Sequence, residues 1–99
     1  MRTKATELAA FLKGKIVFYV NIEEPDNKNS TIETVIEDPK GIVHSIEADT
    51  IIFKGDGKTA SFTIMENAQI LISQTENVEV VTTFAGNGGL QIKCQLLNN

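Results

Sequence analysis

The chain has 99 residues, 41% of them hydrophobic, and 13 acidic against 9 basic residues give it a net charge of −4. This length fits a single domain over 1–99, and the apolar content is sufficient for a packed core, which excludes wholesale disorder. The acidic balance disfavours a function dominated by phosphate binding, because non-specific affinity for nucleic acids comes from clustered lysine and arginine.

The first predicted element is a short helix over residues 3–13. Its apolar side chains recur at helical spacing and share one face: Ala5, Leu8, Ala9, Phe11 and Leu12. Thr3 or Thr6 supplies a hydroxyl that accepts from a free backbone N–H at the start, and Gly14 suits the left-handed position after the end. A helix of this length is not stable alone, so we expect it to dock on a sheet.

The rest of the chain, residues 15–97, alternates in the manner of β-structure. Strands are predicted over 15–22, 31–37, 42–47, 50–54, 59–64, 69–73, 78–84 and 90–97. The residues Asp38-Pro39-Lys40-Gly41 are typical of a β-turn, so we expect 42–47 to pair back on 31–37 as a hairpin. Six to eight short strands with local connections predict a mainly β fold, an antiparallel barrel or a sandwich.

The order of elements in residues 3–73, a helix followed by about five bent strands, resembles that of the Sm-like and SH3-like small barrels. The resemblance implies a small barrel with an extra C-terminal hairpin over 78–97. The Sm-like signature for RNA binding includes an Arg-Gly pair, and the sequence contains none.

His44 is the only histidine, with Glu47 and Asp49 close by in sequence. A histidine with a carboxylate can act as a general acid or base, so a small enzyme using His44 is one alternative function. A lone histidine in a strand is more often packed or solvated, and no nucleophile motif accompanies it. The sequence therefore predicts a protein that is not an enzyme.

Metal and cofactor motifs are also incomplete. One histidine and one cysteine do not supply the four ligands of a zinc site, and the polar segment 26–30 lacks the glycine and glutamate of a calcium loop. The segment 55–59 ends in Gly-Lys-Thr, but Ile52 stands where the phosphate-binding motif needs its first glycine, and a strand follows instead of a helix. We predict no cofactor and interpret both 55–57 and 85–89 as hairpin turns.

A second alternative is a small-barrel protein that binds single-stranded nucleic acid by stacking and phosphate contacts. The residues available for this are Lys15, Tyr19, Lys54 and Lys58.

The favoured hypothesis starts from strands that are apolar on both faces, which one short helix cannot cover. The residues predicted to form an exposed apolar face are Val17, Tyr19, Val35, Val43, Ile51 and Phe53. Such a face indicates a binding or assembly module without catalytic activity. It would form a homo-oligomer or bind a protein partner through an apolar sheet face or an edge strand.

Cys94 is the only cysteine and alternates with Leu90, Ile92 and Leu96, so we expect a buried thiol. The absence of a disulfide framework and of any 20-residue apolar run predicts a cytoplasmic protein without membrane contact.

Overall fold

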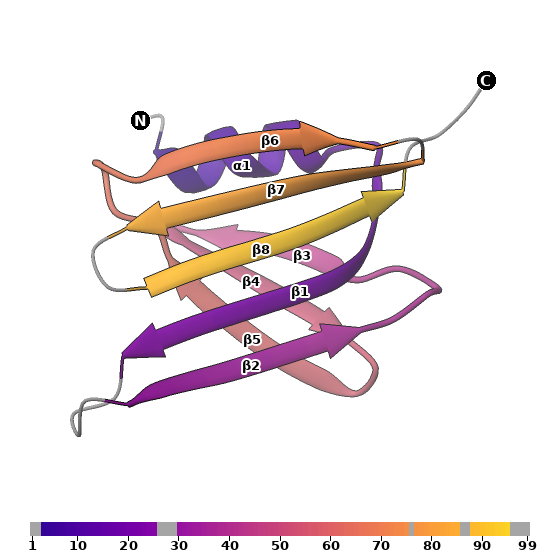
Figure 1. Ribbon diagram of the computed structural model, residues 1–99, viewed down its shortest axis with the longest axis horizontal. Coiled ribbons are helices and arrows are strands. Elements are labelled where there is room, and N and C mark those ends of the chain that lie inside the picture. The colour runs from indigo at the N-terminus through magenta and orange to yellow at the C-terminus, as the bar shows by residue number, and fades with distance from the viewer. Residues whose placement is uncertain (1–2, 26–29, 76, 86–87, 96–99) are drawn as a thin grey trace.

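The computed structural model describes residues 3–25, 30–75, 77–85 and 88–95, which form one helix and eight strands (Figure 1). In chain order these are α1 (Lys4–Leu12), β1 (Ile16–Pro25), β2 (Thr31–Glu37), β3 (Val43–Glu47), β4 (Thr50–Gly55), β5 (Lys58–Thr63), β6 (Gln69–Gln74), β7 (Val78–Ala85) and β8 (Gly88–Gln95). The mainly β fold with a short N-terminal helix is confirmed.

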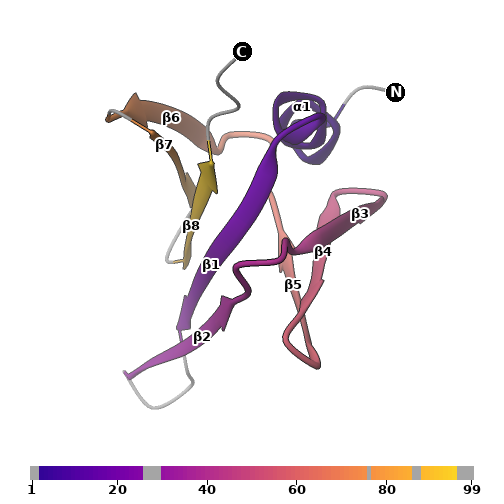
Figure 2. The same ribbon diagram turned by 90° about the vertical axis from the view of Figure 1, so that its right-hand side faces the viewer.

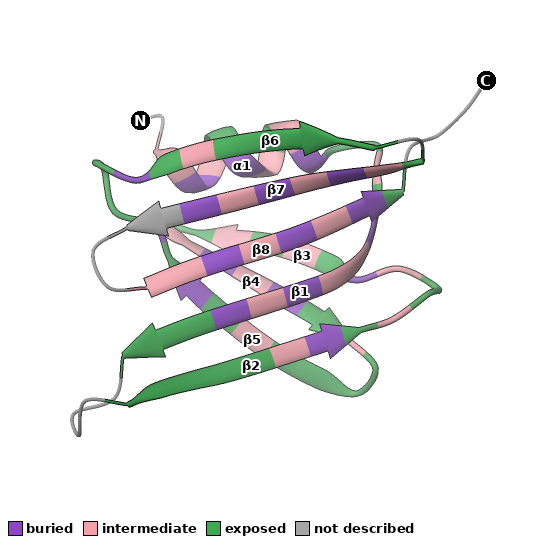
Figure 3. Ribbon diagram, in the orientation of Figure 1, coloured by how far each residue is buried: buried purple, intermediate pink, exposed green. Residues whose placement is uncertain are grey.

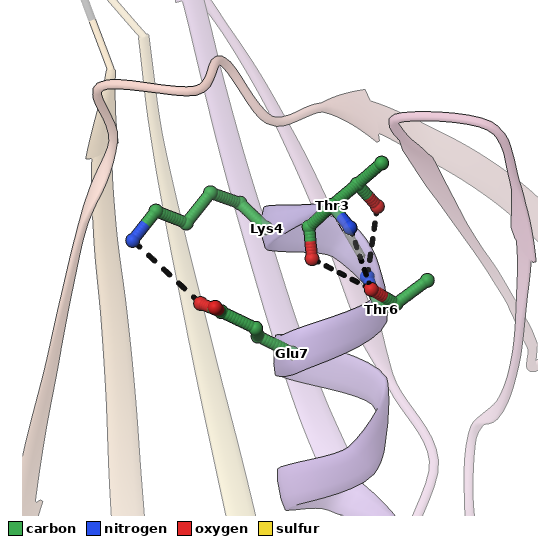
Figure 4. Close-up of polar contacts among 4 residues, drawn as sticks. All are labelled: Thr3, Lys4, Thr6 and Glu7. Carbon is green, nitrogen blue, oxygen red and sulfur yellow. Dashed lines mark hydrogen bonds and ion pairs between the residues drawn. The ribbon is translucent and has the colours of Figure 1, made fainter. Parts of the chain in front are cut away.

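Reciprocal threonine contacts begin α1 (Figure 4). The Thr6 N–H donates to Oγ1 of Thr3 over 3.1 Å, and the Thr3 N–H donates to Oγ1 of Thr6 over 2.8 Å. Two N–H groups that the helix leaves free are thereby satisfied. Gly14 follows the helix with φ of +80°, as expected for a residue in the left-handed region.

The strands form two open antiparallel sheets, ordered β2-β1-β8-β7-β6 and β3-β4-β5. Figure 2 shows α1 and the three-stranded sheet side by side as one layer that faces the five-stranded sheet. The sandwich alternative is therefore correct. The small-barrel alternative is wrong, because neither sheet closes on itself.

The predicted pairing of 42–47 with 31–37 is also wrong. Gly41 N–H donates to the Asp38 carbonyl over 3.0 Å, as in the expected β-turn, but the chain then passes to the other sheet. The Asp38 N–H donates to the Phe18 carbonyl, and the Ile42 N–H donates to the Val17 carbonyl over 2.7 Å. A turn motif reverses the chain, whereas these contacts with β1 determine where the next strand begins.

A β-bulge in β1 changes which side chains face the core. Val17 lies opposite Cys94 and Tyr19 lies opposite Lys93, so Phe18 is an extra residue with no partner in β8. The insertion reverses the alternation, and Val17 therefore shares the inner face with Val20.

The segment 55–57 is a hairpin turn, as predicted. Asp56 and Gly57 connect β4 to β5 with φ of +51° and +71°, which matches the turn that suits the twist of a hairpin. The last hairpin is confirmed as well, since β7 and β8 pair along their length; residues 86–87 of its loop lie outside the described part of the chain.

The core fills the space between the two layers. Its buried apolar members are Ala5, Leu8, Leu12, Val17, Val20, Ile22, Ile36, Ile42, Ile51, Phe53, Phe62, Ile64, Ala68, Val81, Leu90, Ile92 and Cys94.

Candidate functional site

Three of the six residues predicted to form an exposed apolar face belong to the core instead. Val17, Ile51 and Phe53 are at most 1% exposed. The bulge turns Val17 inward, and Ile51 and Phe53 form the inner face of β4. The prediction of their exposure is wrong because α1 does not cover the five-stranded sheet alone: the three-stranded sheet supplies the rest of the second layer.

The remaining three do not gather in one place. Tyr19 and Val35 are half-buried on the outer face of the five-stranded sheet, whereas Val43 lies on the other sheet and is 69% exposed. Around Tyr19, the side-chain amide of Asn21 donates to the tyrosine hydroxyl and to a Glu33 carboxylate oxygen, both over 3.3 Å. The immediate surroundings of Tyr19 on this outer face are therefore polar.

The four residues proposed for nucleic-acid contact are likewise dispersed. Lys15 Nζ is 2.9 Å from Oε1 of Glu79 and 3.3 Å from the centre of the Phe11 ring, so its charge is already partnered. Tyr19 lies on the five-stranded sheet, and Lys54 and Lys58 lie on strands of the three-stranded sheet. The structure does not bring them together as a basic, aromatic surface.

His44 lies in β3 opposite Phe53, on the strand face that points toward the core. Burial lowers the pKa of the imidazole below its usual value, which favours the neutral form. Glu47 is three residues further along the same strand and therefore projects from the opposite face. Among the contacts of the described residues, no hydrogen bond or ion pair joins His44 to Glu47 or Asp49.

Cys94 is a buried free thiol, as predicted. Burial is the main cause that raises the pKa of its thiol to about 11, and the nearby Glu79 carboxylate acts in the same direction against Lys15. A thiol with this pKa is almost fully protonated at neutral pH, which makes it a poor nucleophile.

Two surface hollows accompany these residues. One of about 740 Å³ lies beside the start of α1 and is lined by Thr3, Lys4, Glu7, Asp49, Ile64, Met65, Glu66 and Asn67. The other, about 220 Å³, lies on the five-stranded sheet beside Asn21 and Gly89. Asn21 lines this second hollow, and its side-chain Oδ1 is buried with no hydrogen-bond partner among the described residues.

The described residues contain no group of three or more His, Cys, Asp or Glu side chains placed to hold a metal ion. In the same part of the chain, no helix combines the length and apolar character needed to cross a bilayer. The polar segment 26–30, considered above for calcium, lies outside the described residues except for Ser30.

The feature that the topology adds is the free edge of β6. Each sheet has two edge strands, namely β2 and β6 in one sheet and β3 and β5 in the other. Three of these edge strands carry charged side chains, which discourage pairing with another chain. They are Glu33 and Glu37 on β2, Glu47 on β3 and Lys58 on β5. Strand β6 has the sequence Gln-Ile-Leu-Ile-Ser-Gln and carries no charge, no proline and no glycine.

Figure 3 shows β6 exposed along most of its length at one margin of the molecule. Leu71 is 53% exposed and Ile72 is 50% exposed, and they project from opposite faces of the strand. Only β7 pairs with β6 among the described segments, so the backbone N–H and C=O groups on its other side face outward.

The sequence predicts a strand at 69–73, but the pattern within this strand does not identify it as an edge. The signal was present as a run of three apolar residues without a charged neighbour. Its meaning depends on the strand's position in the sheet, since the same run in a central strand would be ordinary core.

Comparison of the chain with models of protein families, with curated proteins and with solved structures gave no match.

Proposed function

We propose that this protein is a non-catalytic assembly module whose chains associate through the edge strand β6. The observation that carries the proposal is the contrast between β6 and the other three edges: β6 alone is uncharged and exposes two large apolar side chains, Leu71 and Ile72. An edge of this kind serves as a template for an added strand.

The physical basis is addition of a strand to the five-stranded sheet. Backbone hydrogen bonds form along the outward side of β6, and Leu71 and Ile72 lose contact with water when the incoming strand covers them. An apolar sheet face is the less favoured docking surface for two reasons. Tyr19 has polar neighbours on the five-stranded sheet, and Val43 lies on the other sheet.

A charge at Leu71 tests the proposal. We expect the wild-type chain to exceed its single-chain mass of 10.8 kDa at micromolar concentration, as measured by light scattering. Leu71→Lys should raise the dissociation constant at least about tenfold, because it removes apolar contact and places a cation at the junction. A wild-type chain that stays monomeric throughout this range would overturn the proposal.

Val43→Lys provides the matched control. Val43 is the most exposed large apolar residue of the described chain, and it lies on β3 in the other sheet. The variant should keep the wild-type association, and both variants should unfold within about 0.5 kcal/mol of wild type when compared as monomers. Equal weakening by both lysines would show that β6 is not the docking element.

We also assign the protein to a reducing compartment such as the cytoplasm. Support comes from Cys94, which is buried as an unpaired thiol. Location of the tagged chain by cell fractionation tests this assignment.

A further inference from the structure

The sequence of β6 restricts how two copies of the chain can pair. When strands join into one continuous sheet, residues opposite each other share a face. In β6, Leu71 lies on the outer face together with Gln69 and Ser73, whereas Ile70 and Ile72 lie on the inner face. An antiparallel pair of identical strands keeps both faces continuous only when the two-fold axis passes through a residue, not between two residues.

Among the axes that remain, the one through Leu71 gives the best match. It places Leu71 opposite Leu71 of the second copy, Ile70 opposite Ile72, and Gln69 opposite Ser73. Every apolar residue of the strand then meets an apolar residue, and every polar one within the overlap meets a polar one.

The neighbouring axis through Ile72 is poorer. It sets Ile70 against Gln74 and Leu71 against Ser73, so apolar side chains lie opposite polar ones. An axis through Ile70 overlaps the two strands over only three residues of β6.

Resting on the proposed function, we infer that the occupant of the β6 edge is a second copy of this chain, paired antiparallel about a two-fold axis at Leu71. The two five-stranded sheets become one continuous sheet. On the inner side of this sheet, the helix α1 of each copy lies at the level of β6 in the opposite layer (Figures 1 and 2).

This pairing closes the assembly at two chains. Both β6 edges are consumed by the same contact, so the dimer presents no further copy of the docking strand. The outer edges of the enlarged sheet are then the two β2 strands, and these carry Glu33 and Glu37. Like charges at those edges oppose continued growth of the sheet.

Self-cross-linking of single cysteines tests the position of the axis. Residues directly opposite in an antiparallel pair have Cα atoms about 4.5–5.5 Å apart, within the range of a disulfide. Leu71→Cys should therefore form a disulfide-linked dimer under mild oxidation. Ile72→Cys should not, because the two Ile72 positions lie diagonally, beyond the roughly 7 Å limit for a disulfide.

The wild-type chain is the control for unspecific oxidation, because its only thiol is the buried Cys94. As a second variant pair, Gln69→Cys mixed with Ser73→Cys should cross-link, while each alone should not. Both positions are exposed, so these substitutions leave the core intact.

The outcomes separate the inference from the function on which it rests. A mass that reaches a plateau at twice 10.8 kDa, with cross-linking at position 71 and not at 72, supports both. If the mass reaches the same plateau but cross-linking occurs at position 72, at both positions or at neither, the two-fold axis at Leu71 is wrong. Such a result does not contradict the proposed assembly function. A mass that grows without a plateau overturns the closed dimer, and a monomer overturns both.

Discussion

Thr83 places a hydroxyl group in the core where the described residues offer it no hydrogen-bond partner. The residue is fully buried on the inner face of β7, between Ile70 and Leu90 of the adjacent strands. A buried hydroxyl without a partner has lost its hydrogen bonds to water and gained none in exchange.

Thr83→Val should therefore raise the free energy of unfolding by about 1 kcal/mol, since it replaces the hydroxyl with a methyl group of similar size. Urea denaturation measures this change. Thr82→Val, on the half-buried outer face of the same strand, should change stability by less than about 0.5 kcal/mol. A loss of stability in Thr83→Val would indicate that the hydroxyl has a partner after all.

His44 should make stability depend on pH near neutrality. Burial lowers its pKa in the folded protein, so the unfolded chain binds a proton first as the pH falls through the ordinary value of 6.5. The free energy of unfolding should then be highest above this value and fall as the pH decreases from 7.5 to 5.5.

The measurement is the denaturation midpoint at several pH values in this window, compared with His44→Leu. The variant should lose the part of the slope that belongs to the imidazole, because leucine has no ionisable group. An unchanged slope in His44→Leu would show that His44 is not responsible.

At the scale of elements, local patterns located nearly every helix and strand. The helix predicted over 3–13 is observed as Lys4–Leu12, with the expected threonine at its start and Gly14 after its end. These features depend on neighbours in sequence, such as capping hydroxyls and residues that tolerate positive φ. The bulge at Phe18 was not predictable in this way, because an extra residue is defined only relative to the partner strand β8.

The hairpin between β4 and β5 offers a test of local conformation. Gly57 has φ of +71°, and apart from its two chain neighbours no heavy atom lies within 4 Å of the position that a Cβ would occupy. Gly57→Ala should thus destabilise the fold by about 1–2 kcal/mol through backbone strain alone. Gly57→Asn should cost less, since asparagine tolerates this conformation; equal losses in the two variants, measured by thermal unfolding, would argue against backbone strain.

At the scale of the whole molecule, one ion pair links segments that are far apart in sequence. Lys15, between α1 and β1, meets Glu79 of β7 over 2.9 Å, and the two side chains are 26% and 11% exposed. Removing one partner leaves the other charge partly buried without compensation, whereas removing both does not.

We expect Lys15→Met and Glu79→Leu each to lower the free energy of unfolding by about 1–3 kcal/mol. The double variant should lower it by clearly less than the sum of the two single losses. A double-mutant cycle in urea measures the coupling. Strict additivity would show that the contact does not contribute to stability.

By itself, the sequence determined the mainly β class, the positions of the elements, the turns at 38–41 and 55–57, and the burial of Cys94, since these follow from local conformational preference and from alternation along one strand. Only the tertiary structure decided which strands pair, that two open sheets form instead of a barrel, and that Val17, Ile51 and Phe53 belong to the core. It also decided that the uncharged strand β6 lies at an edge. The reason is that strand pairing and edge position arise from hydrogen bonds between segments distant in sequence, and the order of residues within one strand does not specify these bonds.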